Sequence, residues 1–597
     1  MCGIGGMMTR DGGAPSEAVL TALINALGHR GPDGEGRYRA AGLGMVHTRL
    51  AIIDLETGDQ PFYEPEGAAL VANGEIYNYR ELIAQFPGQP LQTHSDCEPP
   101  LYLYRAFGAD YAEHLRGMYG IALFDPNENR LLLSRDPFGI KPLYYAQTPE
   151  GFLFASEPGA IIATGLLAPQ VRAEVAQELL QLQFTTGRNT IFTGIKRLLP
   201  GETVIVVEGN IVERTQRSAL PQNSVVAQDE MTALCRLDTV LMDSVAVHQR
   251  SDVPYGLFLS GGIDSSVILA CMARLNDQPV RAFTAGFPGT GVHDERAHAR
   301  ELARYVGAEH VEVEVTARHL WDLLPEIVAF VDDPVADYAI LPTYVLAAEA
   351  AKELKVVLCG EGGDELFAGY GRYRSVIVRP PFGGRTMRAR GIMDGLGVLR
   401  RETPAWRDGI TAAQGRVSNS DYSRLQQAQA VDCADWLPHD LLIKLDRCLM
   451  AHGLEGRTPL LDPVVAEFAF CLPDHLKVGR QRGKGRGKGK YLLRRWLEEH
   501  LPQAKPFAPK RGFTVPVAEW IAQEARHIGP LIAAQAGIAE ICIPAAVDAL
   551  FSAFARGQAH KRAGNAAWLL LFYAVWHQVH IIGRSPKTDV FDLLASS

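Results

Sequence analysis

Two patterns of apolar and polar residues follow one another along the chain. Up to about residue 212, short apolar runs alternate with clusters of Gly, Asn, Asp and Pro, at 43–46, 70–72, 120–124 and 130–133. Apolar runs bounded by turn-forming residues are typical of β-strands. A last hairpin at about 200–206 precedes a polar linker at about 212–223. The pattern therefore predicts a β-rich first domain over residues 1–212.

From about residue 228 the pattern changes. Apolar strands are expected at 253–259, 280–285 and 355–358, and helices at 267–275 and 294–306. Strands that alternate with helices predict a parallel, doubly wound sheet. An apolar run at 566–576 is shorter than the ~20 residues that span a bilayer, so we expect a buried helix there. The second domain, 213–597, is thus expected to combine an α/β sheet with a helical C-terminal part.

The composition is that of an ordinary globular protein. Of 597 residues, 47% are apolar and 21% charged, and this length exceeds the ~250–300 residues at which single cores stop growing. The net charge of −9 argues against a nucleic-acid partner, because phosphate binding favours a basic surface. Nine cysteines without a CxxC pair predict a reduced, cytoplasmic chain, and no segment predicts a membrane partner.

Cys2 carries the most chemical information in the chain. Because a cysteine side chain is small, Met1 can be removed from in front of it, and Cys2 then becomes the amino terminus. A free α-amino group has a pKa of about 7.7–8.0, close enough to neutrality to accept the proton of the neighbouring thiol. The alternative is a buried structural cysteine behind an initiator methionine. The segments described next favour the nucleophile.

Polar segments in the first domain supply what a thiol needs to cleave a carboxamide. Attack on the amide forms an oxyanion, which a side-chain amide and a backbone N–H stabilise, and Asn73 and Gly74 offer both. A glutamine substrate also carries an α-carboxylate and an α-ammonium group, for which Arg49 and Asp96 have the right charges. Taken singly, an Asn-Gly pair is more often a hairpin turn. Together with Cys2, these residues indicate a glutamine-cleaving thiol.

A serine- and glycine-rich turn separates the predicted strand at 253–259 from the helix at 267–275. Backbone N–H groups in such a turn, together with the helix N-terminus, bind phosphate oxygens. The pattern GxxxxGK[ST] is absent, so the turn is not a Walker A loop. Asp264 is a candidate ligand for Mg²⁺ on the phosphates. A simple connector is the alternative interpretation of this turn, which consists of Ser260, Gly261, Gly262, Ile263, Asp264, Ser265 and Ser266.

A second polar cluster, 359–367, directly follows the predicted strand at 355–358. In an open parallel sheet, ligands lie beyond the carboxyl ends of the strands, so this cluster is expected beside the phosphate-binding turn. Carboxylates there would repel a triphosphate unless a metal intervened, which makes Asp364 the second candidate ligand for Mg²⁺. Glu361 is then left as a base for the attacking ammonia. The alternative is that both acidic residues cap the next helix.

These motifs resemble a known family along nearly the whole chain. The opening MCGIGG, with Arg49, Asn73 and Asp96, resembles the glutamine amidotransferases of the N-terminal-nucleophile class. LSGGIDSS matches the SGGxDS loop of the ATP-pyrophosphatases. Together with CGEGGDELFAGY, these motifs resemble the glutamine-dependent asparagine synthetases, and the segments at 440–447, 456–462 and 490–494 strengthen the match.

The resemblance implies a fold and a set of roles. It implies a four-layer αββα glutaminase domain followed by a doubly wound ATP-pyrophosphatase domain. In the first domain it assigns the nucleophile to Cys2, the oxyanion hole to Asn73 and Gly74, and glutamine binding to Arg49, Glu75 and Asp96. In the second domain it assigns pyrophosphate contact to Lys490. Backbone groups at Phe258, Ala285, Cys359 and Gly360 would hold the adenine nucleotide.

The resemblance also implies a reaction. Cys2 would attack glutamine, release ammonia and leave a thioester that water hydrolyses. Aspartate would attack the α-phosphate of ATP, giving β-aspartyl-AMP and pyrophosphate, with Mg²⁺ and Lys490 offsetting the charge of the pyrophosphate. Ammonia, carried through a sealed passage, would displace AMP while Glu361 accepts a proton. The expected partners are small-molecule substrates, with no nucleic acid and no membrane, and a homodimer is the candidate assembly.

Two segments depart from the family pattern. Where the family has a Pro-Ser pair on the acceptor side, this chain has Tyr338 and Ala339, so the acceptor is aspartate or another carboxylate in a natural product, peptide or sugar acid. The basic, glycine-rich run 477–490 is expected to be a mobile loop that either closes on pyrophosphate or is simply solvated. Two further alternatives are a glutaminase with a non-catalytic C-terminal module and a synthetase with an inactive glutaminase half. Intact predicted residues in both halves argue against them.

Overall fold

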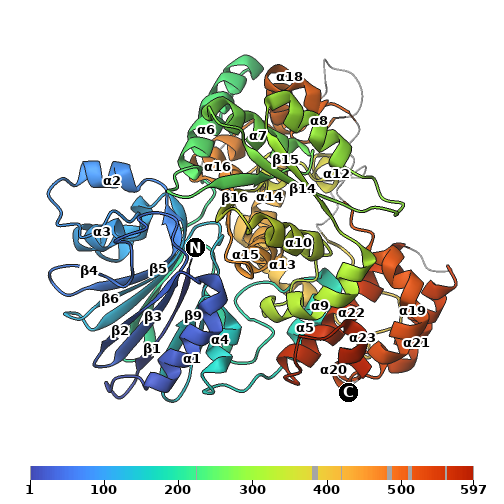
Figure 1. Cartoon of the computed structure of the whole chain (residues 1–597), viewed down its shortest axis with the longest axis horizontal. Coiled ribbons are helices and arrows are strands. Elements are labelled where there is room, and N and C mark those ends of the chain that lie inside the picture. The colour runs from blue at the N-terminus through green and yellow to red at the C-terminus, as the bar shows by residue number, and fades with distance from the viewer. Residues whose placement is uncertain are drawn as a thin grey trace.

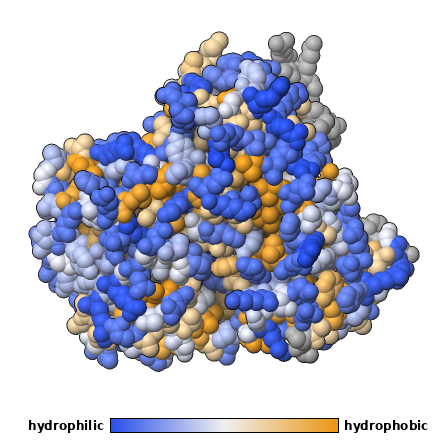
Figure 2. Space-filling view, in the orientation of Figure 1, coloured by the Kyte–Doolittle hydropathy of each residue, from blue (hydrophilic) through white to orange (hydrophobic). Residues whose placement is uncertain are grey.

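The computed structural model describes residues 2–222, 225–378, 388–418, 420–479, 487–508, 514–557 and 561–595. Figure 1 shows a β-rich region at the N-terminus, a second region built around a sheet at the top of the view, and a group of helices that carries the C-terminus. The visible face is mainly hydrophilic, and its apolar residues gather in several separate groups (Figure 2). Within the described residues, no helix is long and apolar enough to cross a membrane.

The first domain consists of two six-stranded antiparallel sheets that pack face to face (Figure 1). Apolar side chains from both sheets, such as Ile4, Leu43, Val71 and Ala122, form the core between them. The first sheet has the order β10-β8-β9-β1-β3-β2 and contains β1 (Gly3–Thr9), β2 (Gly34–Ala40), β3 (Leu43–Arg49), β8 (Tyr144–Gln147), β9 (Gly151–Ala155) and β10 (Ile195–Arg197). The second has the order β12-β11-β7-β6-β5-β4 and contains β4 (Phe62–Tyr63), β5 (Ala69–Ile76), β6 (Gly117–Asp125), β7 (Arg130–Arg135), β11 (Glu202–Val207) and β12 (Asn210–Gln216).

Helices cover the outer faces of both sheets, which confirms the predicted αββα layers. Leu20 and Leu23 of α1 pack against Val46 and Leu153 of the first sheet. On the other side, helix α3 shares a core with residues of the second sheet such as Ile121. The helices of this domain are α1 (Glu17–Leu27), α2 (Tyr79–Gln85), α3 (Pro99–Phe107), α4 (Pro158–Ala163) and α5 (Ala173–Leu182).

The predicted hairpin at the end of this domain forms from β11 and β12. Strand β12 extends to Gln216, so the predicted boundary after residue 212 falls inside a strand. The apolar alternation ends early in β12, because its residues from Val212 onward face solvent. We propose that the boundary between the domains follows Gln216.

The second domain contains the expected parallel sheet, with the order β15-β14-β13-β16-β17. Its strands are β13 (Tyr255–Phe258), β14 (Arg281–Gly286), β15 (Glu309–Glu314), β16 (Val356–Leu358) and β17 (Glu455–Arg457). Helices α7 (Ile263–Leu275) and α8 (Arg296–Val306) follow β13 and β14, as predicted. The pairing Leu257↔Leu358 brings the ends of β13 and β16, and hence the two predicted polar clusters, to one edge of the sheet.

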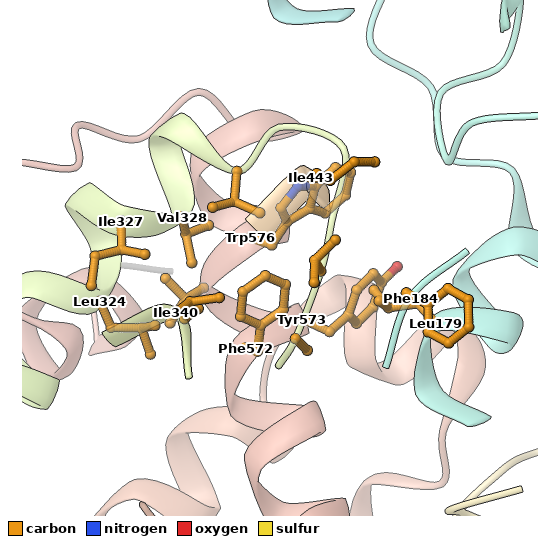
Figure 3. Packing of buried hydrophobic residues seen from close by; sticks show 14 of the residues in the cluster. Leu179, Phe184, Leu324, Ile327, Val328, Ile340, Ile443, Phe572, Tyr573 and Trp576 are labelled. Carbon is orange, nitrogen blue, oxygen red and sulfur yellow. The ribbon is translucent and has the colours of Figure 1, made fainter. Parts of the chain in front are cut away.

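The rest of the described second domain is mainly helical, and α22 (Lys561–His580) packs against several helices of the C-terminal part and against α9. It contains the predicted apolar run 566–576, which is buried as expected. Figure 3 shows Phe572, Tyr573 and Trp576 of α22 among apolar side chains of α9, α10 and α5. The remaining helices are α6 (Glu230–His248), α9 (Ala317–Phe330), α10 (Ile340–Ala350), α11 (Gly363–Leu366), α12 (Gly371–Ile377), α13 (Asp408–Val417), α14 (Arg424–Ala434), α15 (Leu442–Met450), α16 (Pro463–Phe470), α17 (Asp474–Lys477), α18 (Tyr491–His500), α19 (Val517–Ala533), α20 (Ala536–Ile541), α21 (Pro544–Ala555) and α23 (Val590–Ala595).

Candidate active sites

Cys2 lies at the start of β1 and is fixed through both of its backbone groups. Its N–H donates a hydrogen bond to Asn73 Oδ1 at 3.1 Å. Its carbonyl oxygen accepts one from Arg30 Nε at 3.2 Å. The side chain of Cys2 is buried, so the thiol has a fixed position beneath the surface.

Asn73 and Gly74 lie side by side in β5, as the predicted oxyanion hole requires. Asn73 is completely buried, and among the described residues none accepts a hydrogen bond from its Nδ2. A buried amide donor without an acceptor is costly unless a ligand supplies one. At Gly74, a Cβ atom would lie 2.4 Å from the carbonyl oxygen of Met118, so glycine is required for the close approach of β6. The two residues are therefore positioned to receive an oxyanion.

The Cys2 thiol needs a base that removes its proton. Burial raises the pKa of the Cys2 thiol, while a backbone hydrogen bond from Leu50 and the charge of Arg49 oppose that rise. A thiol with a raised pKa is mostly protonated near neutrality, and the thiolate is the reactive form. The α-amino group of a trimmed Cys2 would meet this need.

The residues predicted to bind the glutamine backbone lie around this thiol. Arg49 Nη1 pairs with Asp59 Oδ1 at 2.7 Å, and Nη2 donates to the carbonyl oxygen of Asp54. The Asp59 side chain is 78% exposed, so a substrate carboxylate could take its place on the guanidinium. Asp96 Oδ2 accepts a hydrogen bond from the N–H of Ile76 at 2.7 Å, and burial raises the pKa of Asp96 to about 6.

Glu75, the third predicted glutamine ligand, contacts a residue of the second domain. Its Oε1 lies 3.0 Å from Nη2 of Arg457, the last residue of β17. The sequence analysis did not find Arg457, because nothing in a single sequence pairs two positions so far apart. The only available signal was that Arg457 lies in the segment 456–462, which resembles the family.

Arg30 is a second residue that the sequence analysis missed. It is completely buried and forms a two-pronged ion pair with Asp446 of α15, at 2.8 and 3.0 Å. Its Nη1 also lies 2.7 Å from Glu157 Oε1, and Arg447 Nη1 contacts the same oxygen at 2.8 Å. Cys2 is thus held by a side chain that is itself anchored on the second domain.

The turn that is predicted to bind phosphate lies between β13 and α7, as expected. Gly261 has a φ of +68°, which glycine adopts without strain. Gly262 is the N-cap of α7, so the first N–H groups of the helix face the turn. Ser265 Oγ accepts a hydrogen bond from the N–H of Ser260 at 3.2 Å, and the hydroxyl groups of the two serines share another at 3.1 Å. These bonds fix the shape of the turn.

Asp264, Asp364 and Lys490 converge at one point. Lys490 Nζ lies 2.7 Å from Asp364 Oδ1 and also contacts Asp264 Oδ2. Burial opposes the charged form of Lys490, but the two carboxylates raise its pKa. A Cβ at Gly363 would lie 2.3 Å from Asp264 Oδ1, so only glycine lets this second cluster approach the turn so closely. The two predicted metal ligands and the predicted pyrophosphate-binding lysine therefore form one group.

The residues predicted to hold the nucleotide through their backbone lie along the same edge of the sheet. Phe258 ends β13, and Ala285 is the next-to-last residue of β14. The N–H of Cys359 donates to the carbonyl oxygen of Arg457 at 2.8 Å, so Cys359 could contact a nucleotide only through its carbonyl. At Gly360, a Cβ would lie 3.0 Å from Asp264 Cβ, which shows how closely the cluster approaches the turn.

Glu361 belongs to a group of charged residues that the sequence analysis only partly anticipated. Burial raises the pKa of its carboxyl, and the Lys444 ammonium of α15 opposes that rise. Lys444 Nζ lies 3.0 Å from Asp337 Oδ2. Asp440 is completely buried, accepts a hydrogen bond from Gln183 Nε2 at 2.9 Å, and has a pKa raised to about 8 by burial and by Asp337. This group can recognise a small charged acceptor.

Part of the predicted acceptor segment serves another purpose. Asp333 forms two contacts with Arg197 of the first domain, at 2.5 and 2.6 Å, and accepts a hydrogen bond from Tyr144 at 2.8 Å. Asp332 Oδ2 accepts one from the N–H of Gly159 at 2.7 Å. These two carboxylates therefore bind the first domain, and Asp337 is the one that faces Lys444.

The basic run 477–490 is only partly a loop. Residues 480–486 lie outside the described residues. Lys477 was expected in the mobile loop, but this was wrong: it ends α17, is completely buried and donates to Gln429 Oε1 at 3.0 Å and to the carbonyl of Phe470 at 2.8 Å. Its long apolar stem packs inside while the ammonium finds two acceptors. Gly479 and Lys488 form an antiparallel bridge ahead of Lys490.

Comparison with known proteins supports the family resemblance that the sequence motifs indicate. The sequence matches the asparagine synthase family over residues 236–578 and the glutamine amidotransferase domain over residues 1–217. Glutamine-hydrolyzing asparagine synthetase 1 of Bacillus subtilis is 32% identical over 99% of this chain and 100% of its own. Glutamine-hydrolyzing asparagine synthetase B of Escherichia coli is 29% identical over 84% of this chain and 79% of its own. The amidase chyE of Penicillium rubens is 27% identical over 87% of this chain and 89% of its own.

Proposed function

Since the chain belongs to the asparagine synthase family, we propose that it is a glutamine-dependent amide ligase that converts aspartate to asparagine with ATP. One observation supports the proposal. A single chain holds two groups of residues, each close together in space, whose chemistry fits the two halves of this reaction. The group around Cys2 can cleave glutamine, and the group around Lys490 can bind a triphosphate.

In the first site, Cys2 Sγ attacks the carboxamide carbon of glutamine. Asn73 Nδ2 and the N–H of Gly74 would stabilise the oxyanion, which is supported by the buried amide donor that lacks an acceptor among the described residues. Arg49 would bind the α-carboxylate, and Glu75 and Asp96 the α-ammonium group. Ammonia leaves, and water hydrolyses the thioester to glutamate.

In the second site, the acceptor carboxylate attacks the α-phosphate of ATP, and pyrophosphate leaves. The turn 260–266 would hold the phosphates through backbone N–H groups, and Lys490 would neutralise the leaving pyrophosphate. Asp264 and Asp364 fit Mg²⁺, because this ion usually binds one or two carboxylates of a protein together with water and phosphate oxygens. The two carboxylates lie close enough together to contact the same ammonium group, that of Lys490. When bound, the ion would supply charge neutralisation.

Amide formation follows at the acceptor. Ammonia attacks the acyl carbon of β-aspartyl-AMP, AMP leaves, and Glu361 accepts the proton that ammonia loses. A carboxylate with a raised pKa is a stronger base, and burial gives Glu361 that property. The ammonia is proposed to travel inside the molecule, because ammonium, the dominant form in neutral water, is not nucleophilic.

The cellular setting remains a proposal too. A reduced, cytoplasmic location is supported by the mechanism, which needs Cys2 as a thiol, and all nine cysteines are free of disulfides. The homodimer stays a prediction from sequence.

The acceptor is tested by a screen for pyrophosphate release with ATP. The proposal expects release that depends on aspartate, with asparagine as the product when glutamine is added. Release that depends on another carboxylate, and not on aspartate, would keep the reaction and change the acceptor. The substitution of the family Pro-Ser pair by Tyr338 and Ala339 makes that comparison necessary.

A further inference from the structure

The guanidinium of Arg457 is held on several sides in the interior. Its Nε contacts Glu455 Oε1 at 2.5 Å, and its Nη1 donates to the carbonyl oxygens of His248 at 2.9 Å and of Arg250 at 2.6 Å. These contacts all come from the second domain. The Nη2 atom points across the boundary between the domains, where it lies 3.0 Å from Glu75 Oε1.

The contact with Arg457 favours the charged form of Glu75. Glu75 is 3% exposed, and burial raises the pKa of its carboxyl well above the usual value, although the Arg457 guanidinium opposes that rise. The neighbouring carboxylates of Asp96 and Glu455 raise it further. A buried carboxyl that loses its cationic partner takes up a proton, and a protonated acid no longer attracts an ammonium group.

The backbone of Arg457 joins this contact to the other predicted site. In the parallel sheet, Leu358 pairs with Arg457. The next residue, Cys359, donates its N–H to the Arg457 carbonyl oxygen at 2.8 Å, and Cys359 opens the cluster beside the phosphate-binding turn. The backbone of Arg457 is therefore fixed by the parallel sheet of the second domain and not by the first domain.

We propose that Arg457 is a positioning residue for glutamine: from the second domain it holds the Glu75 carboxyl in the position where it binds the α-ammonium group of the substrate. The inference rests on the proposed function of the first domain. It makes the glutamine site complete only when the parallel sheet of the second domain is in place.

The test compares glutamine hydrolysis with amide formation from ammonium salts. In Arg457→Gln, we expect the KM for glutamine to rise at least about tenfold, because the buried carboxyl is left unpaired. The pH at which this KM changes should move upward relative to wild type, since Glu75 would then titrate at higher pH. Amide formation from ammonium should stay within about twofold of the wild-type rate, because the Arg457 side chain contacts no group that is proposed to act on ammonia.

Two further variants keep the test decisive if Arg457→Gln folds poorly. Arg457→Lys keeps the positive charge and should recover part of the affinity for glutamine. In a Glu75→Gln background, Arg457→Lys should raise the KM no further, because the carboxylate that it serves is gone. Glu81→Gln removes an exposed ion pair between the same domains, Arg250 Nη2 to Glu81 Oε1 at 2.6 Å, and should leave the KM unchanged.

The outcomes separate this inference from the proposed function. If the wild-type protein hydrolyses no glutamine, the proposed function of the first domain fails. If the wild type hydrolyses glutamine but the Arg457 variants keep its KM, or lose ammonium-dependent and glutamine-dependent amide formation equally, only the positioning role is overturned.

Discussion

Cys2, Glu75 and Asp96 are each less than a tenth exposed, at 7%, 3% and 5%, and burial raises the pKa of all three acidic groups. Their ionised forms therefore depend on specific partners: the N–H of Ile76 for Asp96, and Arg457 for Glu75. At this scale, the chemistry follows from where each residue is buried and what faces it.

The raised pKa of Asp96 predicts how glutamine binding depends on pH. Only the carboxylate attracts the α-ammonium group, so the KM for glutamine should rise as the pH falls through about 6, where Asp96 becomes protonated. Steady-state glutamate release between pH 5 and 8 measures this. Asp96→Asn should have a high KM and should lose the change near pH 6. A wild-type KM that is constant down to pH 5 would exclude Asp96 from binding.

Lys490 is predicted to act on the phosphates and not on glutamine. Lys490→Met should lower acceptor-dependent pyrophosphate release by about 10²-fold or more, as expected for the loss of one charge-stabilising group. Glutamate release should stay near the wild-type rate, because Lys490 contacts Asp264 and Asp364 in the second domain. Lys488→Met, two residues away, is the control: its Nζ contacts carbonyl oxygens of Phe507 and Ala508. Equal losses in both variants would remove Lys490 from the chemistry.

At the scale of elements, the segment before α10 joins the two domains. Trp576 and Trp568 of α22 donate to the carbonyl oxygens of Asp332 at 3.1 Å and of Ala336 at 2.7 Å. Arg197, which ends β10, holds Asp333 from the other side. The segment is therefore fixed at its start by both domains, while Asp337 further along faces Lys444.

Removing one partner of the buried Arg197–Asp333 pair should lower the free energy of unfolding. Arg197→Met leaves Asp333 unpaired in the interior and is expected to destabilise the protein by about 3–5 kcal/mol. Thermal unfolding of the variant, compared with Arg37→Met at the exposed Arg37–Glu17 pair, measures the difference. The double variant Arg197→Met with Asp333→Asn should recover much of the loss. A melting temperature for Arg197→Met equal to that of Arg37→Met would contradict the structural role.

Sequence patterns predict the elements well where the signal is local. The strands at 130–133 and 355–358 and the helix at 267–275 were found because an apolar run and a turn define each of them. The structure lengthens the first strand and the helix by a few residues and begins the second strand one residue later. Strand β17 was missed, because its three residues, Glu455–Arg457, include two charges and give no apolar run. Strand β17 is buried because distant parts of the chain cover it, and a local sequence pattern cannot show this.

The same distinction applies to the two sites. Asn73, Asp264 and Asp364 stand in motifs whose spacing indicates their chemistry. Arg30 and Arg457 do not, because their partners Asp446 and Glu75 are hundreds of residues away in the chain. Only the folded structure shows that each anchors a residue of the proposed glutamine site on the other domain.

At the scale of the whole molecule, residues of both domains meet around Cys2 and Glu75. The second domain reaches Cys2 through Asp446 and Arg30, and Glu75 through Arg457. In the proposed reaction, the nitrogen atom released at Cys2 is therefore released beside the domain that uses it. We infer that this arrangement lets one chain pair glutamine cleavage with acyl adenylation.

The most direct measurement compares wild type and Cys2→Ala with glutamine and with ammonium as the nitrogen donor, at saturating ATP and aspartate. The account predicts that Cys2→Ala forms no asparagine from glutamine, while it forms asparagine from ammonium at nearly the wild-type rate. Glutamine-dependent synthesis that persists in Cys2→Ala, or the loss of both activities in a folded variant, would contradict the account of two cooperating sites.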